Sequence, residues 1–221
     1  MASLTVENYL KTIYQICGPG DAPAATGALA EALGVSPGTV TSMLKTLAES
    51  GLATYTPYEG VRLTPQGATL ALRVLRRHRL VELFLATTLN MAWDEVHEEA
   101  EHLEHAVSEL LVDRIDAYLG YPTTDPHGDP IPRADGTFDE SASRTLADCR
   151  AGETFRLARV LDQSPDFLRF LSDSELKLGA CARVVSNRPE SGALTIEVAG
   201  RSTTLGRDAA QRILVEAAGA S

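Results

Sequence analysis

Residues 97–105 read His-Glu-Glu-Ala-Glu-His-Leu-Glu-His, a run of side chains that donate to divalent metal ions. If the segment is helical, its donors spaced by four, three and one residues lie on one face. These donors are His97, Glu101, Glu104 and His105. Two glutamates one turn apart repel each other unless a cation lies between them or water screens them. The spacing therefore predicts a divalent-metal site.

A second pair of donors precedes this segment. His78 and Glu82 repeat the i, i+4 spacing of an imidazole and a carboxylate, so two neighbouring helices could supply ligands to one cleft. The alternatives are a solvated acidic helix face and a catalytic metal site. The zincin pattern fails because Glu101 occupies the position of its second histidine, and no nucleophile constellation is evident. His102 and His127 are interpreted as ordinary surface histidines.

Composition limits the classes of protein to consider. The 221 residues are 44% apolar, enough for one large domain or two to three small ones, and we expect three. The net charge is −10, with the acidic excess mainly in residues 83–150, around the candidate ligands. Three cysteines without a Cys-x-x-Cys pair argue against a disulfide framework and a thiolate zinc site. Without an export signal or a long apolar stretch, we expect a soluble cytoplasmic protein with no membrane partner.

The N-terminal pattern predicts a winged helix-turn-helix. Apolar residues have helical spacing over residues 3–17 and again over 26–33. A third helix opens at Ser36-Pro37. Two short strands, at residues 52–55 and 61–64, flank a turn and would form the wing.

The third helix would present small and hydroxylic groups, which suit contacts with phosphate and with thymine methyl groups. The predicted DNA-contacting residues are Ser36, Pro37, Thr39, Thr41, Ser42 and Lys45. Because only one of them is basic, affinity would depend on dimer geometry, helix N-termini and an arginine cluster at residues 73–79. That cluster could instead be a solvated helix face, and two-helix units with a glycine turn also occur as plain packing motifs.

The rest of the chain predicts a helical segment, a linker and a small β domain. Helical spacing runs through Leu85 and again from about Asp94 to Leu119, and residues 122–145 have linker composition. Short strands separated by glycines are predicted at residues 154–160, 182–186, 194–198 and 212–215, as in a small β-barrel. The predicted fold class is mainly α with a small all-β domain. The predicted domains are a winged helix (1–70), a helical metal-binding and dimerisation domain (71–145) and a barrel (146–221).

The ordered motifs cover the whole chain and resemble one family. They are the first helix, the winged helix, His78-Arg79-Leu80-x-Glu82, Val96-His97-x-x-x-Glu101-x-x-Glu104-His105 and Gly128-x-Pro130-Ile131-Pro132. This combination is similar to the diphtheria toxin repressor and manganese transport regulator family. The resemblance implies a homodimeric, metal-activated transcriptional repressor that binds a DNA operator of metal-uptake genes. The barrel resembles the SH3-like (FeoA-like) domain of the longer, iron-type members.

The resemblance also implies ligands. Glu101, Glu104 and His105, with one ligand from the first helix, would hold the activating metal. Asn8 occupies that first-helix position, where relatives have methionine or aspartate, and neighbouring Glu7 is the alternative ligand.

The same resemblance implies an ancillary ion. His78, Glu82 and His97 would hold it, and Gln163 and Asp166 align approximately with ligands that the barrel lends in iron-type members.

Two departures from relatives bear on the metal. Lys11 stands where manganese regulators have a second glutamate, which favours two separated ions per subunit over a compact two-ion cluster. Glu101 stands where iron-type members have cysteine, and a carboxylate favours hard ions such as Mn(II) over thiophilic ones. Fe(II) should also bind, since these donors do not exclude it. The expected cofactor is therefore Mn(II) or Fe(II).

Two other classes remain open at this stage. One is a metalloenzyme with a fused regulatory barrel, although no general base suited to it is evident. The other is a winged-helix repressor that senses an organic ligand or an oxidant. In the favoured hypothesis the protein is not an enzyme, and the metal ties the first helix to the dimerisation helices.

Overall fold

The computed structural model describes residues 3–18, 22–138 and 143–218. The chain divides into two compact units. The first unit contains the described residues up to His78 together with Glu104–Val107 and Pro132–Thr137, and the second contains the remainder. The proposed boundaries of three sequence domains stay a prediction.

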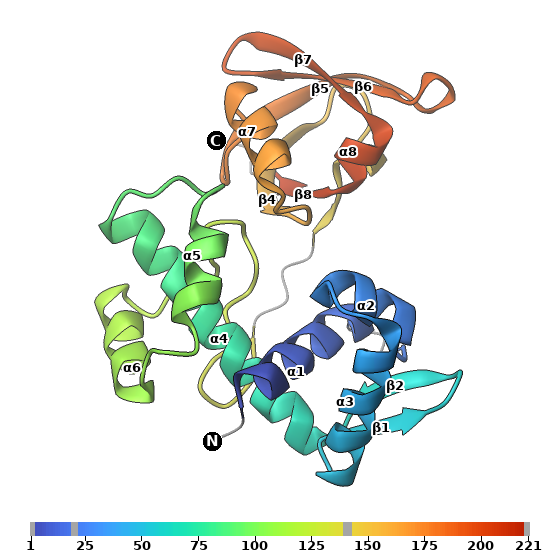
Figure 1. Ribbon diagram of the computed structural model, residues 1–221. Coiled ribbons are helices and arrows are strands. Elements are labelled where there is room, and N and C mark those ends of the chain that lie inside the picture. The colour runs from blue at the N-terminus through green and yellow to red at the C-terminus, as the bar shows by residue number, and fades with distance from the viewer. Residues whose placement is uncertain (1–2, 19–21, 139–142, 219–221) are drawn as a thin grey trace. The chain divides into compact units, whose positions relative to one another are not determined.

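The first unit is a winged helix-turn-helix, as predicted (Figure 1). The winged-helix elements are α1 (Leu4–Cys17), α2 (Thr26–Leu33), α3 (Pro37–Glu49), β1 (Ala53–Thr56) and β2 (Gly60–Leu63), followed by α4 (Pro65–Thr88), which continues into the second unit. Ser36 caps α3, because its side chain accepts a hydrogen bond from the Thr39 amide at 3.1 Å. Leu10, Val40 and Leu44 are fully buried between the helices.

The hairpin of β1 and β2 forms the wing. The strands pair antiparallel, with Ala53 opposite Leu63, and the isolated bridge between Ala24 and Val61 ties the wing to the segment before α2. Tyr58 at the hairpin tip has a positive φ of 69° and a fully exposed side chain. The wing therefore presents an aromatic ring to solvent beside α3.

One predicted helix is two helices. The sequence predicted a continuous helix from about Asp94 to Leu119, but α5 (Val96–Leu103) ends before Glu104, and α6 (Glu109–Tyr118) starts anew. Ser108 starts the second helix, since its side chain accepts from the Leu111 amide at 3.2 Å. Glu104 and His105 therefore lie on a turn rather than on one face with His97.

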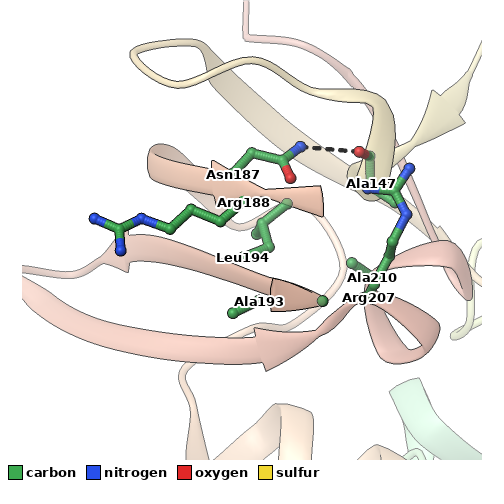
Figure 2. Close-up of a pocket in the computed structure, with 8 residues that line it drawn as sticks. Ala147, Asn187, Arg188, Ala193, Leu194, Arg207 and Ala210 are labelled. Atoms are coloured by element: carbon green, nitrogen blue, oxygen red, sulfur yellow. Dashed lines mark hydrogen bonds between the residues drawn. The ribbon is translucent and has the colours of Figure 1, made fainter. Parts of the chain in front are cut away.

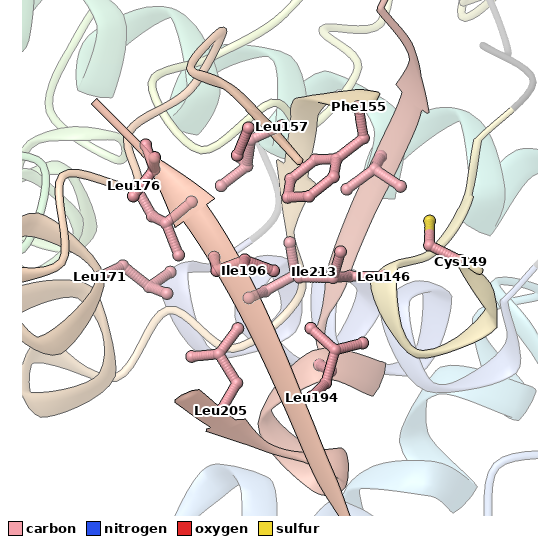
Figure 3. Close-up of a cluster of buried hydrophobic side chains, with 14 of the residues drawn as sticks. Leu146, Cys149, Phe155, Leu157, Leu171, Leu176, Leu194, Ile196, Leu205 and Ile213 are labelled. Carbon is pink, nitrogen blue, oxygen red and sulfur yellow. The ribbon is translucent and has the colours of Figure 1, made fainter. Parts of the chain in front are cut away.

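The second unit holds an antiparallel sheet with the strand order β3-β8-β4-β5-β6-β7. Its elements after α6 are β3 (Arg144–Thr145), η1 (Leu146–Asp148), β4 (Thr154–Val160), α7 (Pro165–Asp173), β5 (Cys181–Arg188), η2 (Pro189–Ser191), β6 (Ala193–Val198), β7 (Arg201–Gly206), α8 (Arg207–Gln211) and β8 (Ile213–Ala217). Figure 3 shows its core, in which Phe155, Leu157 and Ile196 are almost fully buried. The predicted small β domain is thus confirmed.

Sequence reading missed β7 and α7 within this domain. β7 reads Arg-Ser-Thr-Thr-Leu-Gly, and only Leu205 in it is buried, so it carries no apolar alternation. α7 follows Ser164 and has Pro165 in its first turn, which is a helix-start pattern inside a segment interpreted as strands and turns.

Asn187 forms side-chain hydrogen bonds to the backbone at the edge of this core. Figure 2 shows the hollow between η1, β5 and α8, where the Asn187 amide points toward the Ala147 carbonyl. Asn187 Nδ2 donates to the carbonyl oxygens of Ala147 and Cys149, at 2.9 and 2.8 Å. Two backbone acceptors of the buried 3-10 turn are thereby satisfied.

None of the helices in the described part of the chain is long and apolar enough to cross a membrane.

Gly128 permits a close approach of two backbones. Its φ is +87°, and a Cβ at this position would lie 2.1 Å from the carbonyl oxygen of Ala158 on β4. The same approach lets the Val160 amide donate to the His127 carbonyl at 2.9 Å. Gly128 therefore holds the segment around His127 against the sheet.

We expect Gly128→Ala to lower the free energy of unfolding by at least about 2 kcal/mol, because backbone clash adds to left-handed strain. Gly152→Ala is the matched control, since Gly152 has a φ of +89° with nothing within 4 Å of its Cβ position. In the control, the free energy of unfolding should fall by roughly 1 kcal/mol, because only left-handed backbone strain is added. Urea unfolding of both variants measures the difference, and equal losses would refute the close approach.

Candidate metal centre

In the first unit, potential ligands from α1, α4 and the turn after α5 meet around Glu104. His105 Nε2 lies 2.6 Å from Asn8 Oδ1 and 3.1 Å from Glu104 Oε1, and His105 Nδ1 lies 2.8 Å from Glu7 Oε2. His78 Nδ1 lies 2.7 Å from Glu104 Oε2. Two carboxylates and an amide oxygen thus converge on the imidazole of His105, and together these four groups form a donor set that suits a hard divalent ion.

Glu104 is 0% exposed. Burial alone would raise the pKa of its carboxyl, but hydrogen bonds and positive charge from His78 and Lys11 outweigh burial and hold the pKa below its usual value. Lys11 Nζ donates to Glu104 Oε1 at 2.7 Å. The carboxylate is therefore already in the form that a metal ion requires.

The structure brings together three of the four predicted ligands of the activating metal, and also Glu7, the predicted alternative to Asn8. Asn8, Glu104 and His105 lie within hydrogen-bond distance, and Glu7 joins them, so both first-helix candidates touch His105. Glu101 lies on α5 in the second unit, where its Oε1 is 3.9 Å from His97 Nε2. Its membership of this site stays a prediction.

The second unit contains a further donor cluster, which sequence reasoning found only in part. One ligand atom each of Glu82, Asp125 and His127 lies within 4.8 Å of the other two, and all three residues are buried. Glu82 Oε1 is 3.1 Å from His97 Nδ1, as the predicted pairing of these two residues requires. Glu82 Oε2 is 3.9 Å from His127 Nδ1.

The expectation that His127 is a surface histidine was wrong. Its side chain is 0% exposed, and its ring stacks on Trp93. His127 Nε2 lies 2.7 Å from the Trp93 carbonyl oxygen, which can only accept, so Nε2 carries the proton. The lone pair of a neutral ring then sits on Nδ1, the atom that faces Glu82. The signal in the sequence was Asp125-Pro-His127-Gly-Asp129, which its linker composition masked.

The electrostatics of this cluster favour a cation. Burial, followed by the charges of Asp129 and Glu82, raises the pKa of the Asp125 carboxyl well above its usual value, although Arg79 opposes this. Among the described residues, Asp125 Oδ2 and His127 Nδ1 have no hydrogen-bond partner. Buried polar atoms without partners are costly, and a cation bound between them would satisfy both.

The other predicted ancillary ligands make different contacts. His78 Nδ1 lies 2.7 Å from Glu104 Oε2 within the first unit, and its part in an ancillary site stays a prediction. Gln163 Nε2 donates to Asp129 Oδ2 at 2.8 Å. Asp166 is 99% exposed and pairs with Arg169 at 3.2 Å. Among these residues, only Gln163 touches the segment that carries His127.

The predicted DNA-contacting residues lie at the start of α3 and along it. Ser36 is the N-cap of α3 and Pro37 is its first residue, and the Thr39 hydroxyl lies 2.8 Å from that of Ser36. Thr41 and Lys45 line an open groove of about 540 Å³ between α3 and the wing, together with Tyr55 and Tyr58. Ser42 is exposed on the same helix.

A winged helix joined to buried clusters of imidazole and carboxylate donors defines a metal-dependent DNA-binding regulator. Comparisons with protein families agree. Residues 1–61 match the family described as iron dependent repressor, N-terminal DNA binding domain, and residues 64–133 match its metal binding and dimerisation domain. Residues 144–217 match the FeoA domain.

Related proteins match over nearly the whole chain. The iron-dependent repressor IdeR of Mycobacterium tuberculosis is 31% identical over 226 residues, which cover 96% of each chain. The diphtheria toxin repressor of Corynebacterium efficiens is 30% identical over 223 residues, covering 96% of this chain and 95% of that protein. A solved manganese-dependent transcriptional repressor in complex with manganese is 42% identical, with a TM-score of 0.88, covering 96% of this chain and 99% of that one.

The chain belongs to the iron-dependent repressor family, whose members are metal-dependent transcriptional repressors. The resemblance inferred from the motifs is thereby confirmed. Because these proteins are DNA-binding repressors rather than enzymes, the metalloenzyme alternative is set aside.

We expect Asp125→Asn to stabilise the metal-stripped protein at pH 7.5 by roughly 1–2 kcal/mol, because it removes a buried like charge. The Asn oxygen can still accept from the amides of His127 and Asp129, at 2.8 and 2.9 Å. Since the folded pKa is raised above the ordinary 3.8, wild-type stability falls as pH rises between these values. The advantage of the variant should therefore vanish in acid.

Thermal unfolding from pH 3.5 to 8 measures this difference. Asp173→Asn changes an exposed aspartate and serves as the control, with no expected pH-dependent gain. A variant that is less stable than wild type across the whole pH range would contradict the electrostatic account.

Proposed function

We propose that the protein is a homodimeric repressor that Mn(II) or Fe(II) activates to bind an operator upstream of metal-uptake genes. The observation that supports this most strongly is the contact of His105 with Glu7 and Asn8. It joins α1 of the winged helix to a turn of the metal-binding segment through side chains that are all metal donors. Such a protein acts on DNA, so we place it in the cytoplasm.

We assign the activating ion to Glu104 and His105, with Asn8 or Glu7 from α1 and with Glu101. The oxygen-rich donor set favours a hard ion, and Fe(II) lies above Mn(II) in the Irving–Williams order, so availability decides between them. The manganese complex of the related repressor supports manganese as the first ion to test.

We assign a second ion in each subunit to Glu82, Asp125 and His127, with His97 beside Glu82. Asp125 Oδ2 and His127 Nδ1 have no hydrogen-bond partner among the described residues, which supports this assignment, whereas the predicted ligand Asp166 is 99% exposed. Gln163 hydrogen-bonds to Asp129 in the same segment, so its proposed role is to orient this segment rather than to bind the ion.

The proposed mechanism couples metal to DNA through α1. A bound ion supplies a strong, directional electrostatic link between donors that otherwise meet only through hydrogen bonds. Asn8 and Glu7 then hold α1 against His105, and α1 packs on the helix-turn-helix that carries α3. Linkage requires DNA to tighten metal binding by the factor by which metal tightens DNA binding, typically about 5- to 150-fold.

For DNA, we propose that α3 enters the major groove and that the wing lies beside it. The exposed hydroxyls of Thr39 and Ser42 and the ammonium of Lys45 would contact phosphate and base edges. The residues of the α3 N-terminus offer backbone amides to phosphate, which offsets the scarcity of basic residues. Tyr58 at the wing tip is placed to reach the sugar-phosphate backbone.

We expect Glu104→Gln to abolish metal-dependent operator binding, because the amide keeps the shape and loses the anionic donor. The variant should also melt at a lower temperature than wild type, because Lys11 loses its counter-charge. Fluorescence anisotropy with DNA from upstream of metal-uptake genes, titrated with Mn²⁺ at fixed salt, measures the effect. Glu190→Gln, an exposed glutamate in η2, is the control. An unchanged metal dependence in Glu104→Gln would count against this site.

We expect Lys45→Ala to weaken operator and non-operator DNA alike, because a lysine–phosphate contact carries no sequence information. The slope of log affinity against log salt should fall by about 1 per lost contact. Lys177→Ala, at an exposed position of the C-terminal domain, should leave the affinity for DNA and its salt dependence unchanged. A loss confined to the operator would instead assign Lys45 to base readout.

A further inference from the structure

Lys11 is a buried lysine in the middle of the candidate metal site. The chain has three lysines, and Lys45 and Lys177 are exposed, whereas Lys11 is 5% exposed. Its Nζ lies 2.7 Å from Glu104 Oε1. A buried ammonium is costly unless a paired charge compensates it, so this contact stabilises Lys11 in the interior.

The Lys11 contact uses an oxygen that a metal ion would need. Glu104 Oε1 is also the carboxylate atom that lies 3.1 Å from His105 Nε2, and His78 occupies Oε2. An ion held between Glu104 and His105 must therefore approach Oε1. An ammonium has three donors and no lone pair, so it cannot become a ligand, and its charge repels a divalent ion at this range.

We propose that Lys11 is the internal counter-cation of the metal-free protein and competes with the metal ion for Glu104. The ammonium compensates the buried carboxylate while no metal is bound, and it must release Oε1 for the ion to bind. Lys11 thereby raises the metal concentration at which the repressor is activated. The inference rests on the proposed function, because it takes Glu104 as a ligand of the activating ion.

The decisive variant is Lys11→Met, which keeps the length of the side chain and removes its charge. In the metal-free variant the buried Glu104 carboxylate loses its lysine counter-charge and keeps its contacts with His78 and His105, so Mn²⁺ affinity should rise by roughly 10- to 100-fold. The chelator-stripped variant should melt at a lower temperature than wild type, and the Mn²⁺-saturated forms should melt alike. Competition with a metal-chelating dye measures the Mn²⁺ affinity, and thermal unfolding measures the melting temperatures of the stripped and Mn²⁺-saturated proteins.

Lys177→Met is the matched control, since it makes the same change at an exposed position and should leave Mn²⁺ affinity unchanged. An affinity of Lys11→Met that equals or falls below that of wild type would overturn the inference. A purely structural role for Lys11 also predicts a loss of stability, but it does not predict tighter metal binding. If Lys11→Met folds only when Mn²⁺ is added, that result supports the competition.

A measurement on the wild-type protein covers the case in which the variant does not fold at all. Reductive methylation of Lys11, followed by peptide mass spectrometry, should be slow in stripped protein and faster in Mn²⁺-saturated protein, with Lys177 as the internal standard. Equal rates would overturn the inference.

Glu104→Gln separates the failure of the proposed metal site from the failure of the competition. If Glu104→Gln binds Mn²⁺ as wild type does, the proposed site fails. If Glu104→Gln loses Mn²⁺ binding while the Mn²⁺ affinity of Lys11→Met is unchanged, only the competition is refuted.

Discussion

The buried carboxylate of Glu104 is the interaction on which the arrangement of the first unit depends. Lys11 from α1, His78 from α4 and the neighbouring His105 all contact its two oxygens. A buried charge of this kind must be compensated, so three segments distant in the sequence are held together at one point. In the proposed mechanism, a cation that replaces one of these partners acts on the position of α1.

The two donor clusters differ in how they are compensated. The first is balanced by Lys11, and its Glu104 carboxyl keeps a lowered pKa. The second places Asp125 near Glu82 and Asp129, and its Asp125 carboxyl has a raised pKa. In the proposed assignment, an ion at the first cluster displaces Lys11, whereas an ion at the second relieves a repulsion that Arg79, 3.8 Å from Asp125 Oδ2, offsets only in part.

Charge also constrains how the protein meets DNA. The chain carries a net charge of −10, and α3 offers Lys45 as its basic group. A binder of this kind gains little from general attraction to phosphate, so its affinity must depend on how well the paired recognition helices fit the groove. Regulation through the position of α1 suits such a protein, because a small change in geometry has a large effect when charge contributes little.

The sequence by itself determined the winged helix and the C-terminal β domain, because these follow from local periodicity, caps and turns, and its residue types pointed to Glu104 and His105 as candidate donors. It could not determine that the predicted helix after Asp94 breaks before Glu104, since helical spacing continues through the break. Nor could it show that His127 is buried beside Glu82, because burial of a loop depends on the backbone approach that Gly128 permits. Only the tertiary structure decided these points, since each depends on contacts between residues far apart in the chain.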